Sequence, residues 1–251
     1  MQKNSVVSVN HLFATYDDAT ILEDISFEVP KGEIFMIVGP SGCGKSTLLN
    51  HIIGLQSATA GNVLILGKDI WGKEAHSLLK KIGVAYQSGA LFGSMTLLEN
   101  VRLPLEEWTS LSQEAMNTIA LEKLQLVGLA HFAHQLPSTL SGGMQKRAAI
   151  ARAIVLDPEI LFLDEPCSGL DPITSAGIDA LILKLSKQSG MTFVIISHEL
   201  RSISAIADTV VLLHHKKIIA MGTPLALMKS SDPFVKQFFN PVSEMIKDAK
   251  K

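Results

Sequence analysis

Short apolar runs, separated by glycine, proline or acidic residues, make up most of the first 40 positions of the chain. Turn signals stand at Asp17-Asp18 and at 30–32 (PKG). Runs of this length that are rich in Val, Ile and Phe predict strands joined by tight connections. The predicted strands are 6–13 (VVSVNHLF), 25–29 (ISFEV) and 34–38 (IFMIV).

The run at 34–38 leads straight into glycine-rich sequence and then into 45–54 (KSTLLNHIIG), where apolar residues follow helical spacing. A glycine that closes such a pattern is typical of a helix end. The sequence therefore predicts a strand, a loop and a helix in succession. Two further strands are expected at 62–66 (NVLIL) and 82–86 (IGVAY).

Between Ser88 and Pro158 the strand pattern gives way to helical spacing. The predicted helical segments are 96–105, 112–129 and 142–156. Ser110 and Gln113 are three positions apart, which suggests a capping box before the second segment. We expect residues 88–158 to form a helical subdomain inserted into an α/β core.

Strand and helix patterns alternate again after residue 158, which favours parallel strands joined by crossover helices. Asp171, Thr223 and Asp232 each precede a proline, as an N-cap before proline at the first helical position would. The predicted fold is an α/β domain over residues 5–240 with an antiparallel β subdomain and the inserted helical subdomain. The polar tail 241–251 is expected to be a short helix or disordered. The predicted late strands are 160–165, 191–197 and 209–213.

Composition narrows the classes of protein. A chain of 251 residues fits one domain and can bury a substantial core. No apolar stretch approaches the roughly 18 to 20 residues that span a bilayer, and the N-terminus lacks a secretory signal, so we expect a cytosolic protein. The net charge of −2 and the scattered Lys and Arg argue against nucleic acid as a partner. Cys43 and Cys167 are expected to be reduced thiols, because two cysteines make no disulfide framework.

Residues 39–46 (GPSGCGKS) match the phosphate-binding loop pattern between a predicted strand and a predicted helix. Glycines let backbone N–H groups turn toward phosphates, and the helix N-terminus adds partial positive charge. A full charge comes from Lys45, and Ser46 offers a hydroxyl to Mg²⁺. A purely structural glycine-rich turn is the alternative. The pattern predicts ATP and Mg²⁺ as cofactors, with the nucleotide held by Gly39, Pro40, Ser41, Gly42, Cys43, Gly44, Lys45, Ser46 and Thr47.

Two carboxylates, Asp164 and Glu165, close the apolar strand 160–165. Consecutive strand residues point in opposite directions, so the two can take separate roles. We expect Asp164 to hold the metal through water and Glu165 to act as the base that activates water. Solvated carboxylates at a strand end are common, and the phosphate loop is what favours the functional interpretation.

Residues 140–145 (LSGGMQ) stand at the start of a predicted helix. Ser141 and the amides of Gly142 and Gly143 would therefore form a second anion site at a helix N-terminus. With these motifs the chain resembles the nucleotide-binding subunits of ABC transporters over roughly residues 5 to 235. The resemblance implies a homodimer, in which this signature of one protomer closes over the ATP held by the phosphate loop of the other.

Further positions match the same family in order and spacing, although each alone is more often structural. The resemblance implies that Tyr16 stacks on adenine and that Gln87 senses Mg²⁺ and the γ-phosphate. It also implies that residues 168–171, with Asp171, cross the dimer interface. His198 would contact the γ-phosphate. The implied catalytic set is Glu165, His198, Lys45 and Gln87, and the implied metal ligands are Ser46, Gln87 and Asp164.

Two departures from the common family pattern are Met144 in the signature and Cys167 after Asp-Glu-Pro. The Ser-Gly-Gly-Met sequence and the segment 88–101 (SGALFGSMTLLENV) resemble the phospholipid-trafficking ATPases of the Mla type. That resemblance implies lipid transport between the membranes of a Gram-negative-type envelope, with the chain on the cytoplasmic side of the inner membrane. The implied partners are a permease, an MCE-type lipid-binding protein and a STAS-domain protein.

Two alternatives stay open. One is an ABC ATPase for another cargo, such as amino acids or lipoproteins. The other is a non-transport ABC protein that acts on ribosomes or DNA, against which stand the single ABC unit and the absence of a basic patch.

Overall fold

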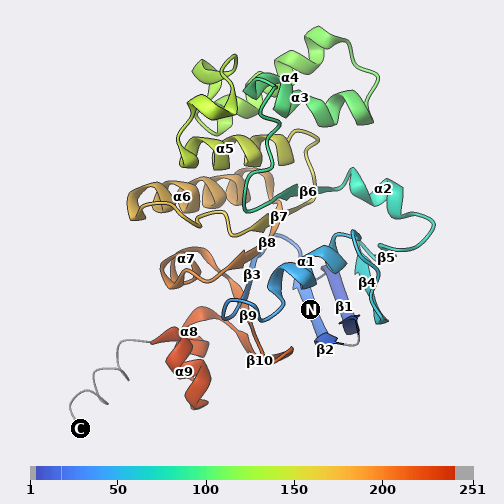
Figure 1. The fold of residues 1–251 in the computed structure, drawn as a ribbon, viewed down its shortest axis with the longest axis vertical. Coiled ribbons are helices and arrows are strands. Elements are labelled where there is room, and N and C mark those ends of the chain that lie inside the picture. The colour runs from blue at the N-terminus through green and yellow to red at the C-terminus, as the bar shows by residue number, and fades with distance from the viewer. Residues whose placement is uncertain (1–3, 18, 241–251) are drawn as a thin grey trace. The chain divides into compact units, whose positions relative to one another are not determined.

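The computed structural model describes residues 4–17 and 19–240. The described chain forms two compact units, one from residues up to Lys73 and from Ile196 onward, the other from Glu74–Ile195. Figure 1 shows the elements of both along the chain. Asp18 and the tail 241–251, for which the sequence suggested a turn and a short helix or disorder, lie outside the described residues.

The first unit contains an antiparallel sheet with the strand order β2-β1-β4-β5. Strand β2 alternates along most of its length, and Ile25, Phe27 and Val29 are buried between exposed neighbours. This alternation is typical of a sheet with one face on the core. It confirms the predicted strands near the N-terminus. The strands are β1 (Ser5–Tyr16), β2 (Ala19–Pro30), β4 (Ala60–Ile65) and β5 (Lys68–Asp69).

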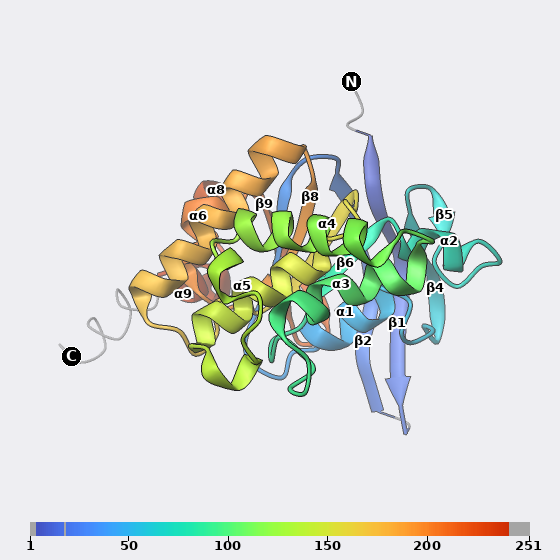
Figure 2. The same ribbon diagram turned by 90° about the horizontal axis from the view of Figure 1, so that it is seen from above.

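The first unit also holds three further strands, β3, β9 and β10, in which β9 pairs with both of the others. All five residues of β3 are buried, and β3 pairs in parallel with β9, as expected for a strand covered on both faces. Helix α1 follows β3 and lies beside β1 and β2 in both views (Figures 1 and 2). The elements are β3 (Ile34–Val38), α1 (Lys45–Ile52), α7 (Leu200–Ile206), β9 (Thr209–His214), β10 (Lys217–Gly222), α8 (Pro224–Met228) and α9 (Pro233–Phe239).

Strands β9 and β10 form a hairpin whose two-residue loop is His215-Lys216. Both residues have positive φ, 46° and 70°, which is the backbone conformation of a tight hairpin turn of this length. Residues other than glycine and asparagine are uncommon there.

The second unit combines parallel strands with a group of helices. Strands β6 and β7 pair in parallel, and β8 begins in this unit, while its last two residues, Ile196 and Ser197, are counted in the first. Helices α3, α4 and α5 pack against one another, and the described chain between residues 88 and 158 contains helices and turns only, as the sequence predicts. The elements are α2 (Ala75–Leu79), β6 (Ile82–Ala85), α3 (Leu97–Trp108), α4 (Gln113–Leu126), α5 (Gly142–Ala153), β7 (Ile160–Asp164), α6 (Pro172–Ser189) and β8 (Thr192–Ser197), with 3-10 turns at Ala130–Phe132 and Pro137–Thr139.

Helix caps were predicted with mixed success. Asp171, Thr223 and Asp232 cap α6, α8 and α9, each with proline at the first helical position, as predicted. The capping box at Ser110 was wrong, because α4 begins at Gln113 and its N-cap is Ser112, whose hydroxyl accepts from the Ala115 amide. Among the described residues, no helix combines the length and the apolar character needed to cross a membrane.

Candidate functional site

The phosphate loop starts where buried strand β3 ends. At Gly39, φ is 155°, and a Cβ there would lie 2.2 Å from the Leu213 carbonyl oxygen at the end of β9. Only glycine fits this approach. Gly44 has φ of 102° and caps α1, so the chain turns sharply into the helix. These two positions explain why the loop needs glycine at its start and at its end.

Lys45 is the first residue of α1 and is only 7% exposed. Its Nζ donates to the carbonyl oxygens of Gly39 and Pro40, each at 2.9 Å, so the ammonium is held inside the loop. The first turn of α1 carries no acidic residue. Ser46 and Thr47 follow in this turn, with Ser46 exposed. A helix N-terminus with a fixed ammonium is a site for a phosphate group.

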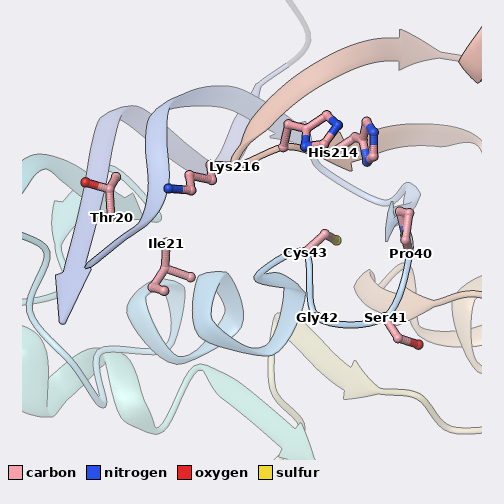
Figure 3. Close-up of a pocket in the computed structure, with 9 residues that line it drawn as sticks. Thr20, Ile21, Pro40, Ser41, Gly42, Cys43, His214 and Lys216 are labelled. Atoms are coloured by element: carbon pink, nitrogen blue, oxygen red, sulfur yellow. The ribbon is translucent and has the colours of Figure 1, made fainter. Parts of the chain in front are cut away.

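A cleft of about 320 Å³ lies beside the loop, at the small end of the range for ligand sites. Figure 3 shows Cys43 pointing toward the His214 side, with Thr20 and Ile21 across from it on β2. Burial raises the pKa of the Cys43 thiol although Lys45 opposes this, so the thiol is protonated at neutral pH. Both cysteines are free, as predicted. The lining residues are Thr20, Ile21, Pro40, Ser41, Gly42, Cys43, His214, His215 and Lys216.

Tyr16 ends β1 and is 38% exposed. Its hydroxyl donates to Gln56 Oε1 at 2.5 Å and lies 3.2 Å from His51 Nε2, and the two rings are stacked with centroids 6.2 Å apart. Burial lowers the pKa of His51, so this ring is neutral near pH 7. The structure ties the hydroxyl of Tyr16 to the end of α1 and places the residue outside the lining of the cleft. Its adenine-stacking role stays a prediction.

The carboxylates at the end of β7 have different environments. Asp164 is buried, whereas Glu165 is partly exposed and has a left-handed backbone with φ of 46°. Burial, and next the negative charge of Asp164, raise the pKa of Tyr86. Ala85 of β6 pairs in parallel with Leu163 of β7, so Tyr86 and Asp164 stand at neighbouring strand ends. Strand β7 ends at Asp164, one residue earlier than the predicted 160–165, and Glu165 follows it with a left-handed backbone. The alternation expected for consecutive strand residues therefore does not apply to this pair.

Gln87 follows β6 and is exposed. Its Nε2 donates to Ser168 Oγ at 3.2 Å, which joins it to the 168–171 segment. Asp171 in that segment caps α6, and its carboxylate accepts from the amides of Ile173 and Thr174 and from the Thr174 hydroxyl. These bonds, the hydroxyl bond foremost, lower the pKa of Asp171. Asp171 therefore has a structural role as the N-cap of α6, which is separate from its predicted role at a dimer interface.

The signature begins at Ser141, the N-cap of α5, whose hydroxyl accepts from the Met144 amide. Ser141 and Gly142 are exposed, and the first turn of α5 has no acidic residue, as an anion site at a helix N-terminus requires. Gly143 is buried, and a Cβ there would lie 2.4 Å from Thr174 Cγ2 on α6. At Gly142 the nearest atom, Leu170 Cδ2, would be 3.6 Å away. A side chain at Gly143 would therefore clash with α6, whereas a side chain at Gly142 would not.

Gly143→Ala should lower the free energy of unfolding by about 1–3 kcal/mol, because the new methyl group overpacks against Thr174. Thr174→Ser in the same chain should restore most of it, since serine lacks Cγ2 and keeps the hydroxyl that binds Asp171. Urea unfolding measures both effects. Gly142→Ala is the control and should change stability by less than about 0.5 kcal/mol. Equal stability of the Gly143 and Gly142 variants would contradict the steric explanation.

His198 is exposed and follows the last residue of β8. Within the first unit the predicted site residues are the 39–47 loop, Tyr16 and His198. Within the second unit the structure places Gln87, Asp164, Glu165 and residues 168–171 at neighbouring strand and loop ends, with 141–143 at the start of α5. The sequence did not point to Lys146 and Arg152 of α5, whose side chains bind backbone carbonyls in this unit. A cation on a helix usually lies in solvent, and no local signal distinguishes these two.

Comparison with known proteins gives a consistent result. A family model described as "ABC transporter" matches residues 22–168. The chain is 39% identical to a Mycobacterium leprae protein named as a probable ribonucleotide transport ATP-binding protein, mkl, over 96% of this chain and 70% of that protein. It is equally 39% identical to the Escherichia coli intermembrane phospholipid transport system ATP-binding protein MlaF, over 96% of this chain and 90% of that protein. Among solved structures, the ATP-binding cassette MJ0796, described as a dimer in a post-hydrolysis state with ADP and Pi, matches with a TM-score of 0.79 and 33% identity, over 86% of this chain and 98% of that one.

Proposed function

This chain belongs to the ABC transporter family as one of its ATPases, and from that premise we propose that it is the motor of a system that moves phospholipids between two membranes. The observation that carries the ATPase function is the phosphate loop, in which Lys45 is held by two loop carbonyls at the N-terminus of α1. The relation to MlaF over most of both chains supports the cargo. The Ser-Gly-Gly-Met signature and the 88–101 segment also support it.

We propose that Ser46, Gln87 and Asp164 hold Mg²⁺, because each brings an oxygen that this ion accepts as a ligand. Ser46 brings a hydroxyl, Gln87 an amide oxygen and Asp164 a carboxylate, which are the hard oxygen ligands that Mg²⁺ prefers. When bound with ATP, the ion would neutralise charge that develops on the transferred phosphoryl group.

In the proposed reaction the chain's own groups have separate roles. Lys45 binds the β- and γ-phosphates, and Glu165 accepts a proton from the attacking water. His198 orients the γ-phosphate. Because Ser141 and Gly142 stand exposed at the start of α5, they are available to cap a nucleotide held by a second copy of the chain. The functional unit is therefore a homodimer with two shared sites, and the dimeric MJ0796 cassette supports this arrangement.

The remaining parts of the proposal follow from the cargo. The ATPase would bind a membrane-spanning permease from the cytoplasmic side of the inner membrane. An MCE-type lipid-binding protein and a STAS-domain protein would complete the system. Phe92, in the 88–101 segment that we assign to the permease contact, is 52% exposed. Burial of this ring against a partner would remove apolar surface from water.

The test is affinity purification of the tagged chain from detergent-solubilised membranes, with mass spectrometry of the proteins and lipids that co-purify. We expect a permease, an MCE-type protein and bound phospholipid. Lys45→Met at equal expression is the control for nucleotide-dependent assembly. A permease from another class of transporter would contradict the lipid cargo and leave the ATPase function intact.

One second function has a specific observation in its favour. The mkl relative, which is named for ribonucleotide transport, is as similar to this chain as MlaF is. The chain covers only 70% of mkl, against 90% of MlaF, so phospholipid is the better supported cargo. Ribonucleotide in place of phospholipid in the purified complex would favour this alternative. Stimulation of ATP hydrolysis by ribosomes or DNA would instead favour a non-transport role.

A further inference from the structure

A side chain of the signature helix reaches two backbone segments that carry predicted catalytic residues. Lys146 lies five positions after Ser141 on α5. Its Nζ donates to the carbonyl oxygen of Gln87 and, at 3.2 Å, to the carbonyl oxygen of Glu165. The Lys146 ammonium group therefore connects the backbone of Gln87, which is expected to sense the metal, with the backbone of Glu165, which is expected to activate water.

Two more hydrogen bonds close a ring. The Ser168 amide donates to the same Glu165 carbonyl at 3.1 Å, and Gln87 Nε2 donates to Ser168 Oγ at 3.2 Å. The circuit runs from Lys146 to Glu165, Ser168, Gln87 and back to Lys146. We call these four residues the Lys146 ring. All belong to one compact unit.

The backbone at Glu165 explains why such a ring matters. With φ of 46°, Glu165 has a left-handed conformation that costs energy for any residue with a Cβ. Such a conformation persists where the surroundings determine it, and these sites are often functional. Here the Glu165 carbonyl accepts two hydrogen bonds, one of them from a charged donor, which makes the stronger kind of bond.

A second cationic side chain of α5, Arg152, also binds the backbone of the segment that follows β6. The Arg152 guanidinium donates to the carbonyl oxygens of Gly89 and Ala90, both at 2.8 Å. Burial lowers the pKa of Arg152, but such a group keeps its charge at neutral pH. The chain from Gln87 to Ala90 is therefore fixed to α5 through three carbonyls, and α5 is the helix whose N-terminus we assign to the partner's nucleotide.

We propose that Lys146 is a positioning residue for ATP hydrolysis, which sets the Glu165 carboxylate and the Gln87 amide relative to the start of α5. This inference rests on the proposed ATPase function. Lys146 touches neither nucleotide nor water in this scheme and acts through the two carbonyls that it binds. A displacement of about 1 Å in a catalytic group can lower the rate about 100-fold, so loss of the ring has a measurable effect.

The kinetic test uses the purified full-length chain at concentrations where it dimerises. Lys146→Met should lower kcat about 10- to 100-fold, with the KM for ATP changed by less than about two-fold, because the phosphate loop is untouched. Lys146→Arg should recover most of kcat, since a guanidinium can donate to both carbonyls. Lys184→Met, at an exposed position of α6, is the matched control and should leave kcat unchanged. Unchanged kcat in Lys146→Met, or equal losses in the Met and Arg variants, would overturn the proposal.

A double-variant cycle separates positioning from a general structural role. In a Glu165→Gln background, Lys146→Met should lower the residual rate by a clearly smaller factor than it does in the parent chain, because the part of the effect that acts through the Glu165 carboxylate is already lost and only the part through Gln87 remains. A full further loss in that background would show that Lys146 acts elsewhere, and would overturn the proposal.

Hydrogen exchange tests the Lys146 ring independently of ATP hydrolysis. The amide of Ser168 should exchange at least about 10-fold faster in Lys146→Met than in the parent chain, while the amides of α5 stay protected. Unaltered exchange at Ser168 would overturn the ring, whether or not the chain hydrolyses ATP. Faster exchange in a chain that does not hydrolyse ATP would support the ring and refute the proposed function.

Discussion

Glu165→Gln should lower the steady-state ATP turnover of the chain by about 100-fold or more, because a positioned general base contributes roughly 10²- to 10⁴-fold to a rate. The amide has the size of the carboxylate but cannot take a proton from water. The local backbone should not change, since glutamine meets the same left-handed strain and the Glu165 carbonyl keeps its bonds to Lys146 and Ser168. Single-turnover hydrolysis of ATP measures the chemical step directly.

The same variant should accumulate as an ATP-bound dimer, because closure precedes hydrolysis in the proposed cycle. Size-exclusion chromatography with and without ATP measures this, and the specific activity of the parent chain should rise steeply with protein concentration. Glu159→Gln is a matched control just before β7, where the carboxylate forms a 3.2 Å ion pair with Lys81. It should change turnover by less than about two-fold. Near-normal hydrolysis in Glu165→Gln would refute the assignment of the base.

The phosphate loop and the helix caps could be predicted because their chemistry is local. The pattern at 39–46 contains the glycines, the lysine and the serine hydroxyl within eight consecutive residues. The structure adds the reason for one of these glycines, because a Cβ at Gly39 would lie 2.2 Å from the Leu213 carbonyl oxygen. The caps at Asp171, Thr223 and Asp232 depend on residues at most three positions away. The predicted capping box at Ser110 was wrong because Ser110 and Ser112 both precede the helical run. The sequence alone does not show which of the two serines is the N-cap.

Contacts between distant segments could not be predicted in this way. The Lys146 ring joins residues up to 81 positions apart, and no periodicity marks Lys146 as different from any other helix cation. Tyr16 is a similar case, because its hydroxyl bond to Gln56 spans 40 positions. The sequence predicts which residues carry chemistry from their types and spacing, whereas the partners of these residues depend on which strand ends the fold brings together. This explains why the candidate site was predicted residue by residue and its supporting contacts were not.

Lys45→Met should weaken ATP binding about 100-fold while the chain stays folded, since methionine preserves the apolar stem and removes the charge. A hydrogen bond to a charged group is worth about 1.5–3 kcal/mol, and 2.7 kcal/mol corresponds to about 100-fold in affinity. Calorimetric titration with ATP and with AMP distinguishes the cause. The loss should be much smaller for AMP, because Lys45 is expected to bind the β- and γ-phosphates.

Ligand-dependent unfolding tests the same variant with a second readout. At an ATP concentration of about 100 times the parent Kd, binding should stabilise the parent chain by about 2.7 kcal/mol and a 100-fold weaker variant by only about 0.4 kcal/mol. Lys217→Met is the matched control in the same unit, because that side chain pairs with Glu23 at 2.8 Å and lies outside the lining of the cleft. Its stabilisation by ATP should equal that of the parent. If Lys45→Met bound ATP within about three-fold of the parent, the ammonium held by Gly39 and Pro40 would be only an internal brace of the loop, and the phosphate grip would have to come from the backbone amides and the α1 N-terminus alone.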